Sequence, residues 1–280
     1  DDAVEAWKQL RRRPIFWVSA LLIAVAVLLA VAPGLIARAT PTYCQLNNSY
    51  GPPTVQHPFG FDRQGCDIFA RTVYSTRTAF EIGLVVAVSS VVLGAVFGAL
   101  SGFFAGSWLD EGILWLKGVL DAIPFFLFVV AVAYSMQGHP LAMHVAMIAT
   151  FWTTTGRYVR GEVIKLKSME FVEAARAVGV PQGAIIFRHI LPNTSHILLV
   201  QGTLVFVTAI KAEVILSFLG LGVQDGVSWG LMISQSTNEV TAGFFNNFIA
   251  ASLAMFVLVM AFNFFSDALQ DALDPRKVSA

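Results

Sequence analysis

Six long apolar stretches limit what this chain can fold into more than any other feature of its sequence. Each is close to the roughly 20 residues that a helix needs to cross a hydrocarbon core. Composition agrees, because 56% of the 280 residues are hydrophobic and 13% are charged, which is more apolar than a soluble domain requires. We therefore predict an all-α membrane protein with six transmembrane helices. The stretches are residues 15–36, 82–104, 113–134, 141–158, 196–219 and 244–265.

The lysines and arginines between these stretches and near their ends predict which helix ends face the cytoplasm. Basic residues concentrate on the cytoplasmic side of membrane proteins. With the N-terminal segment 1–14 inside, thirteen fall on the inner side and four on the outer side. We therefore expect the tail 266–280 and the loop 159–195 inside, and the loop 37–81 outside. The inner residues are Lys8, Arg11, Arg12, Arg13, Lys117, Arg157, Arg160, Lys165, Lys167, Arg176, Arg188, Arg276 and Lys277, and the outer ones Arg38, Arg63, Arg71 and Arg77.

A polar segment interrupts the apolar pattern between the fourth and fifth stretches. Ala174 and Ala175 favour a helix over residues 168–178, and Gly179 suits the left-handed residue that closes a helix. We expect a second short helix after this turn, so the segment forms either a compact cytoplasmic unit or an amphipathic pair in the headgroup region. This second helix is expected to start at Pro181, to end at Pro192 and to carry Ile185, Ile186, His189 and Ile190 on one face.

The same segment resembles the cytoplasmic EAA loop of ABC importer permeases. In that family the loop reads E-A-A, three residues, Gly, nine residues, then I-x-L-P. The chain keeps this spacing with Glu173, Ala174, Ala175, Gly179, Leu191 and Pro192. His189 replaces the isoleucine, as is typical of the dipeptide and oligopeptide branch of the family.

Further segments resemble the same branch along nearly the whole chain. Residues 57–67 are similar to its H-P-x-G-T-D-x-x-G-R-D segment, with Phe61 in place of Thr and Cys66 in place of Arg. Residues 212–222 resemble its A-E-x-x-L-S-F-L-G-L-G run. The S-W-G at 228–230 and the D-A-L-D-P-R at 271–276 resemble two more of its signatures. The chain is identified as a member of the C-type branch of peptide permeases, which are binding-protein-dependent transport inner-membrane components.

The resemblance implies a type I ABC importer permease fold in the plasma membrane, surrounded by lipid. It implies a subunit that translocates di- or oligopeptides, with the 159–195 loop coupled to one or two ABC ATPase subunits that bind ATP and Mg. A second homologous permease subunit and an extracytoplasmic peptide-binding protein are the other implied partners. An importer of nickel or another small solute is the alternative within the family. A stand-alone secondary transporter or channel is the alternative outside it, although no internal inverted repeat is visible.

Sequence motifs give no indication of an enzyme. The chain lacks G-x-x-x-x-G-K-[ST], so a P-loop for ATP must belong to another polypeptide. His139 and His144 lie five residues apart, which is not one helical face, and no cysteine pair has zinc spacing. We therefore expect no catalytic residue, no metal site and no cofactor in this chain. The formal net charge of zero gives no indication of a nucleic acid partner.

Four polar residues outside the EAA-like loop are further candidates. Lys211 and Glu213 lie two apart in the fifth apolar stretch, so they cannot face each other on one helix. They either line the translocation pathway or form structural ion pairs with a neighbouring helix. Cys44 and Cys66 both fall in the outer loop, where oxidation is allowed, and they form a disulfide or remain two thiols. The loop itself is either a solvated connector or a contact for substrate or binding protein.

Overall fold

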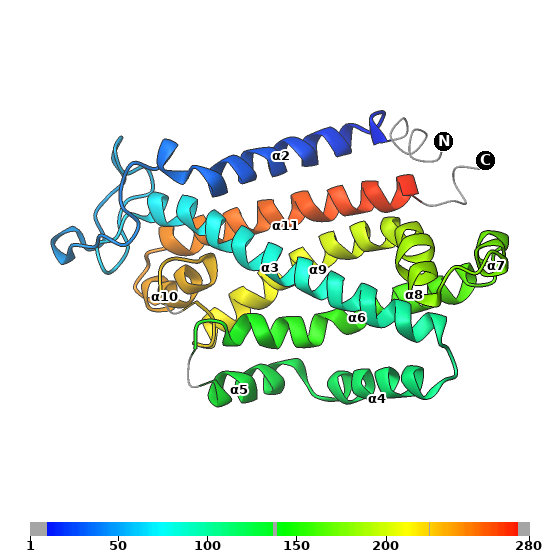
Figure 1. Ribbon diagram of the computed structural model, residues 1–280. Coiled ribbons are helices and arrows are strands. Elements are labelled where there is room, and N and C mark those ends of the chain that lie inside the picture. The colour runs from blue at the N-terminus through cyan, green and yellow to red at the C-terminus, as the bar shows by residue number, and fades with distance from the viewer. Residues whose placement is uncertain (1–9, 137–138, 224, 274–280) are drawn as a thin grey trace. The chain divides into compact units, whose positions relative to one another are not determined.

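The computed structural model describes residues 10–136, 139–223 and 225–273, and it is helical, with no strand in these ranges (Figure 1). This confirms the predicted all-α class. The α-helices are α2 (Pro14–Val31), α3 (Ile68–Phe103), α4 (Trp108–Ala122), α5 (Phe125–Ser135), α6 (Ala142–Leu166), α7 (Glu170–Ala177), α8 (Gln182–Ala184), α9 (Ser195–Phe218), α10 (Trp229–Thr241) and α11 (Asn246–Leu273).

Among the described residues, four helical segments are long and apolar enough to cross a membrane: α2, α3, the continuous segment Gln182–Phe218, and α11. A fifth results if α4 and α5 are counted as one broken span. Apart from its first residue, the expected 141–158 stretch lies within α6, which is not one of these segments. Its apolar part is interrupted by threonines 153–155 and by Arg157. The chain is thus a multi-pass membrane protein, and the number of six crossings stays a prediction.

The second helix begins earlier than its apolar stretch indicates. α3 starts at Ile68, so part of the expected outer loop 37–81 is helical. The Asp67 carboxylate accepts a hydrogen bond of 2.9 Å from the N–H of Ala70, as N-terminal capping residues do. Ile68 and Ala70 are fully buried. The capping hydrogen bond and the burial of the first residues therefore determine where this helix begins, and a hydropathy pattern shows neither of them.

The predicted single helix over 113–134 is wrong. The structure has two helices there, α4 and α5, whose axes differ by 95°. Pro124 precedes α5, and Ile123 has an extended backbone with φ −85° and ψ 125°. Proline lacks the N–H that a continuous helix would need, and its ring disfavours the helical conformation of the residue before it. A single proline therefore breaks this apolar stretch.

The fifth apolar stretch ends as expected, and an additional helix follows it. α9 stops at Phe218, before Gly220 and Gly222. α10 then begins at Trp229, where the Ser228 hydroxyl accepts a hydrogen bond of 3.0 Å from the N–H of Leu231. The Asp-Pro pair at 274–275, which favours the end of a helix, lies outside the described residues.

The chain divides into two units, residues 1–84 with 207–280 and residues 85–206. In the first unit, α2 and α11 run side by side (Figure 1). Phe16 stacks on Phe265 with a centroid distance of 5.8 Å, and Arg13 forms an ion pair with Asp271. Contacts between the N-terminal and the C-terminal parts of the chain therefore build this unit.

In the second unit, α3 packs closely on α6 through small residues. A Cβ atom at Gly98 would lie 2.6 Å from the carbonyl oxygen of Gly156 and 2.9 Å from the Cβ of Val159. Gly94 and Gly102, one turn to either side, meet the same helix at 2.6 Å and 2.8 Å. Glycine is required at these positions because the two backbones approach too closely for a side chain.

Candidate functional site

The EAA-like loop contains a short helix with a sharp end. α7 carries Glu170 and Glu173 in its first turn and Arg176 in its last, an order that suits the helix dipole. Gly179 has φ +82°, and the following N–H, of Val180, donates to the carbonyl of Ala175 at 3.0 Å. This left-handed closure is the turn predicted from the sequence.

After Gly179 the structure differs from the prediction. The second helix begins as α8, widens into a π-helical turn over Ile185–Ile190 and tightens into a 3-10 turn over Leu191–Thr194. It then continues into α9, so Pro192 does not end it. The missing N–H of Pro192 is accommodated by this change of winding. The side-chain amide of Asn193 also donates to the His189 carbonyl at 2.6 Å.

A buried hydrophobic cluster lies beneath the loop. It joins α7 and the π-helical turn to α3 and α6 within the second unit. The Arg176 guanidinium also lies over the ring of Phe103, 5.6 Å from its centroid. Because both α7 and the π-helical turn contribute buried side chains to this cluster, they are fixed to the two long helices. The loop contributes Val172, Ala175, Ile185, Ile186 and Ile190, and the long helices contribute Ala99, Phe103, Val159 and Val163.

Most of the predicted loop residues lie on its surface. Glu173, Ala174, Gly179 and Pro192 are exposed, His189 and Leu191 are half-buried, and Ala175 is buried.

Two hydrophobic residues that the motif does not mark lie on the same side of α7 as Ala174. Val178 is 79% exposed and Phe171 is 39% exposed. Positions 171, 174 and 178 share one helical face. The exposed face of α7 is therefore apolar with an acidic residue beside it. The spacing of Phe171 and Val178 was visible in the sequence and could have identified them.

A buried carboxylate connects the helices that lead into the loop. Asp110 in α4 accepts hydrogen bonds from the Ser101 hydroxyl, from the N–H of Gly106 at 2.9 Å and from Arg160. The Arg160 contact is bidentate, with Nε 3.0 Å from Oδ1 and Nη2 2.9 Å from Oδ2. The Asp110 side chain is 3% exposed. Such charge-assisted pairs fix geometry strongly, so this cluster holds the α3–α4 turn against α6.

The two charged residues of the fifth stretch lie in different environments. Glu213 is 4% exposed, and its carboxylate accepts a hydrogen bond of 2.6 Å from Ser217 one turn later. The same hydroxyl accepts from the N–H of Val223 at 3.2 Å. Glu213 therefore stabilises the chain where α9 ends. Lys211 is exposed, and the structure does not bring the two residues into contact.

The outer loop is closed by a disulfide between Cys44 and Cys66, whose Cα atoms are 4.2 Å apart. An isolated antiparallel bridge joins the same two residues. Cys66 is 1% exposed. The residue that replaces the Arg of the family pattern is therefore one half of this bond, which cross-links a segment of 22 residues.

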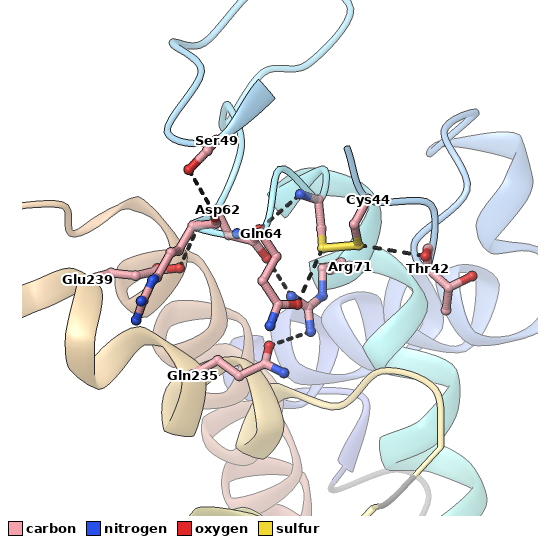
Figure 2. The surroundings of a disulfide bond; sticks show 10 residues. Thr42, Cys44, Ser49, Asp62, Gln64, Arg71, Gln235 and Glu239 are labelled. Atoms are coloured by element: carbon pink, nitrogen blue, oxygen red, sulfur yellow. Dashed lines mark hydrogen bonds and ion pairs between the residues drawn. A yellow bond between two sulfur atoms is a disulfide. The ribbon is translucent and has the colours of Figure 1, made fainter. Parts of the chain in front are cut away.

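A buried ion pair lies beside the disulfide and joins the loop to α10 (Figure 2). Arg71 pairs with Asp62, and the two side chains are 5% and 2% exposed. Arg71 also donates to Gln235 at 2.7 Å. The Glu239 carboxylate accepts from the N–H of Arg63 at 2.8 Å. The sequence alone does not reveal this cluster, because the two residues from α10 lie more than 160 positions after the loop residues that they contact.

Comparison with known proteins identifies the family of this chain. The model of the family described as binding-protein-dependent transport system inner membrane component matches residues 94–279, so the chain belongs to this family.

Individual relatives cover nearly the whole chain. The dipeptide transport system permease protein DppC of Alkalihalophilus pseudofirmus is 33% identical over 98% of this chain and 90% of its own length. The oligopeptide transport system permease protein OppC of Bacillus subtilis is 33% identical over 97% of this chain and 89% of its own. OppC of Mycobacterium tuberculosis is 37% identical over 81% and 79%. Transport rather than catalysis is the role of these relatives.

Proposed function

We propose that the chain is the permease subunit of an ATP-driven importer of di- or oligopeptides. The observation that carries the proposal is the EAA-like loop, which presents exposed residues on a buried, helical base. The named relatives, which are dipeptide and oligopeptide permeases, support the peptide as substrate. A second, homologous permease subunit would complete the pathway.

The exposed face of α7 suits a protein partner. Phe171, Ala174 and Val178 would fill an apolar groove on an ATPase subunit, and Glu173 would meet a basic group at its rim. ATP and Mg would be bound by that partner. Because the base of the loop is packed against α3 and α6, a displacement of α7 would be passed to these helices as a rigid movement.

The outer loop would meet the extracytoplasmic peptide-binding protein. Its disulfide closes the loop on itself, and the hydrogen bonds of Arg71 and Arg63 hold it to α10, so the contact surface is ordered before binding. Selection of the peptide would rest with the binding protein, since the spans contribute few polar groups that could discriminate one substrate from another. Lys211, which is exposed, stays the candidate of the fifth stretch for the pathway, whereas the buried Glu213 is more suited to a structural role.

The test is a charge reversal on the exposed face of α7. Glu173→Lys should lower uptake of a labelled dipeptide by about tenfold or more, because like charges at an interface cost several kcal/mol. Uptake is measured in proteoliposomes that contain the complete importer. Co-purification of the ATPase with the permease is measured in parallel and should fall with it.

Glu111→Lys is the matched control, since Glu111 is also an exposed first-turn glutamate, at the start of α4. It should leave uptake and co-purification near the wild-type level. Wild-type uptake by Glu173→Lys would show that α7 is not the coupling element. A complex that takes up another solute but no peptide would contradict the proposed substrate.

A further inference from the structure

A cavity of about 250 Å³ lies between α3, α4 and α6 in the second unit. Three of the side chains that line it are basic: Lys117 from α4 and Arg157 and Arg160 from α6. No lining residue is acidic. Gly98, Gly156 and Gly161 contribute no side chains to the wall, which leaves room for a ligand. The wall of this α4–α6 cavity is therefore positively charged, and its glycines leave space beside the basic side chains.

The carboxylates that pair with these cations lie behind the wall. Asp110 is buried and already accepts four hydrogen bonds. Asp121 pairs with Lys117 and, at 3.4 Å, with Arg157. The carboxylates hold the basic side chains in position without lining the cavity.

Arg157 is the basic residue best able to bind a ligand. Its side chain is 66% exposed, and its ion pair with Asp121 uses one nitrogen. A guanidinium carries five N–H donors in a fork that matches the oxygens of a phosphate. Donors of Arg157 therefore remain for an anion in the cavity.

The face of α4 that points away from the cavity indicates that this helix lies at the membrane interface. Trp108 and Trp115 are 84% and 71% exposed, and a separation of seven residues puts them on one helical face. Exposed tryptophans are enriched where a membrane meets water. Lys117, which lines the cavity, is on the same helix. Ile113 and Lys117, which line the cavity, lie on the opposite side of α4, so the helix that carries this aromatic face also forms one wall of the cavity.

We infer that the α4–α6 cavity binds the phosphate of an anionic phospholipid headgroup. Basic cavities between transmembrane helices on the cytoplasmic side are suited to such headgroups, and charge-assisted hydrogen bonds from arginine to phosphate are strong and directional. The inference does not depend on the transported solute. Ile113 and Leu114, which also line the cavity, would contact the apolar part of the lipid.

The inference is tested by native mass spectrometry of the purified full-length chain in detergent. Phosphatidylglycerol, phosphatidylethanolamine with the same acyl chains, and inorganic phosphate are offered separately and in competition. Phosphatidylglycerol should be retained in preference to phosphatidylethanolamine, and inorganic phosphate should not displace it. Arg157→Gln should weaken retention of phosphatidylglycerol by about fivefold, the effect of one basic residue near an anionic membrane surface.

Lys165→Gln is the matched control, because Lys165 is a basic residue of α6 that is 71% exposed and does not line the cavity. It should retain phosphatidylglycerol as the wild type does. Circular dichroism checks that both variants keep their helices, and Arg157→Lys should restore part of the retention. Equal retention of the two lipids, or an Arg157→Gln variant that equals the wild type, would overturn the inference. Displacement by inorganic phosphate would show a site for a soluble anion instead.

Discussion

Arg71 is the residue on which the order of the outer loop most depends. Its guanidinium neutralises the buried Asp62 and reaches Gln235 in α10. Arg71→Ala would leave the Asp62 carboxylate buried without its partner, which typically costs about 3–5 kcal/mol. We expect a markedly lower melting temperature, measured by thermal unfolding of the purified chain in detergent.

Arg63→Ala is the comparison for this prediction. Arg63 is exposed and contacts Glu239 through its backbone N–H, which the substitution keeps. Its melting temperature should stay within a degree or two of wild type, since surface substitutions usually change stability by less than about 0.5 kcal/mol. Equal melting of the two variants would mean that the buried ion pair does not hold the loop.

The disulfide acts on the same loop by a different mechanism. Cross-linking residues 22 positions apart restricts the unfolded chain and contributes about 3 kcal/mol in the chain-entropy model. Replacing both cysteines by serine should therefore lower stability by a comparable amount. Mass spectrometry of unreduced peptides should recover Cys44 linked to Cys66 in the wild type, and recovery of both as alkylated thiols without reduction would reject the bond.

At the scale of elements, the packing of α3 on α6 depends on glycine. Gly98→Ala places a methyl group 2.6 Å from the carbonyl oxygen of Gly156, so the helices must separate. Overpacking of this kind costs about 1–3 kcal/mol. Gly118→Ala in α4 meets nothing within 4 Å and should be neutral or slightly stabilising, because alanine favours a helix over glycine by about 1 kcal/mol.

Chemical unfolding of both alanine variants measures this difference. The helical signal of the native state should be alike in the two, so that a lower unfolding midpoint in Gly98→Ala reports packing alone. A Gly98→Ala variant as stable as Gly118→Ala would show that α3 and α6 do not pack as closely as described.

The sequence predicted those elements whose cause is local. The turn at Gly179 follows from one residue that takes a left-handed conformation, and the end of α9 at Phe218 lies within one residue of the end of the apolar stretch 196–219. The break at Pro124 also has a local cause, but hydropathy alone predicts one continuous helix over residues 113–134. The predicted end of the second loop helix at Pro192 was wrong for the opposite reason. π-Helical winding and the hydrogen bond from the Asn193 amide let the helix continue past this proline.

The sequence alone does not predict which distant segments pair with each other. Asp62 and Arg71 lie near each other in the chain, yet Gln235 reaches Arg71, and Glu239 reaches the N–H of Arg63, from α10, a helix that was not predicted. The same is true of Asp110, whose partner Arg160 is 50 positions away. Buried polar groups must find partners, but a single sequence does not show which.

At the scale of the whole molecule, the formal net charge is zero, so orientation rests on where the basic residues fall. In the predicted topology, thirteen of them fall in segments expected on the side of the EAA-like loop, and four fall in the disulfide loop, which is expected on the other side. Disulfides persist in oxidising compartments and are rare in the cytosol. The bond between Cys44 and Cys66 thus gives a second argument for the same orientation, independent of charge.

This orientation predicts opposite labelling of two exposed valines. Val55 in the outer loop is 100% exposed, and Val178 at the end of α7 is 79% exposed. Cys44 and Cys66 are bonded to each other, so a single introduced cysteine supplies the reactive thiol. In intact cells that produce the chain without an ATPase partner to cover α7, a membrane-impermeant maleimide should label Val55→Cys at once and Val178→Cys only after the membrane is permeabilised. Labelling of both before permeabilisation would place the EAA-like loop outside, where no cytoplasmic ATPase could reach it, and would remove the basis of the proposed coupling.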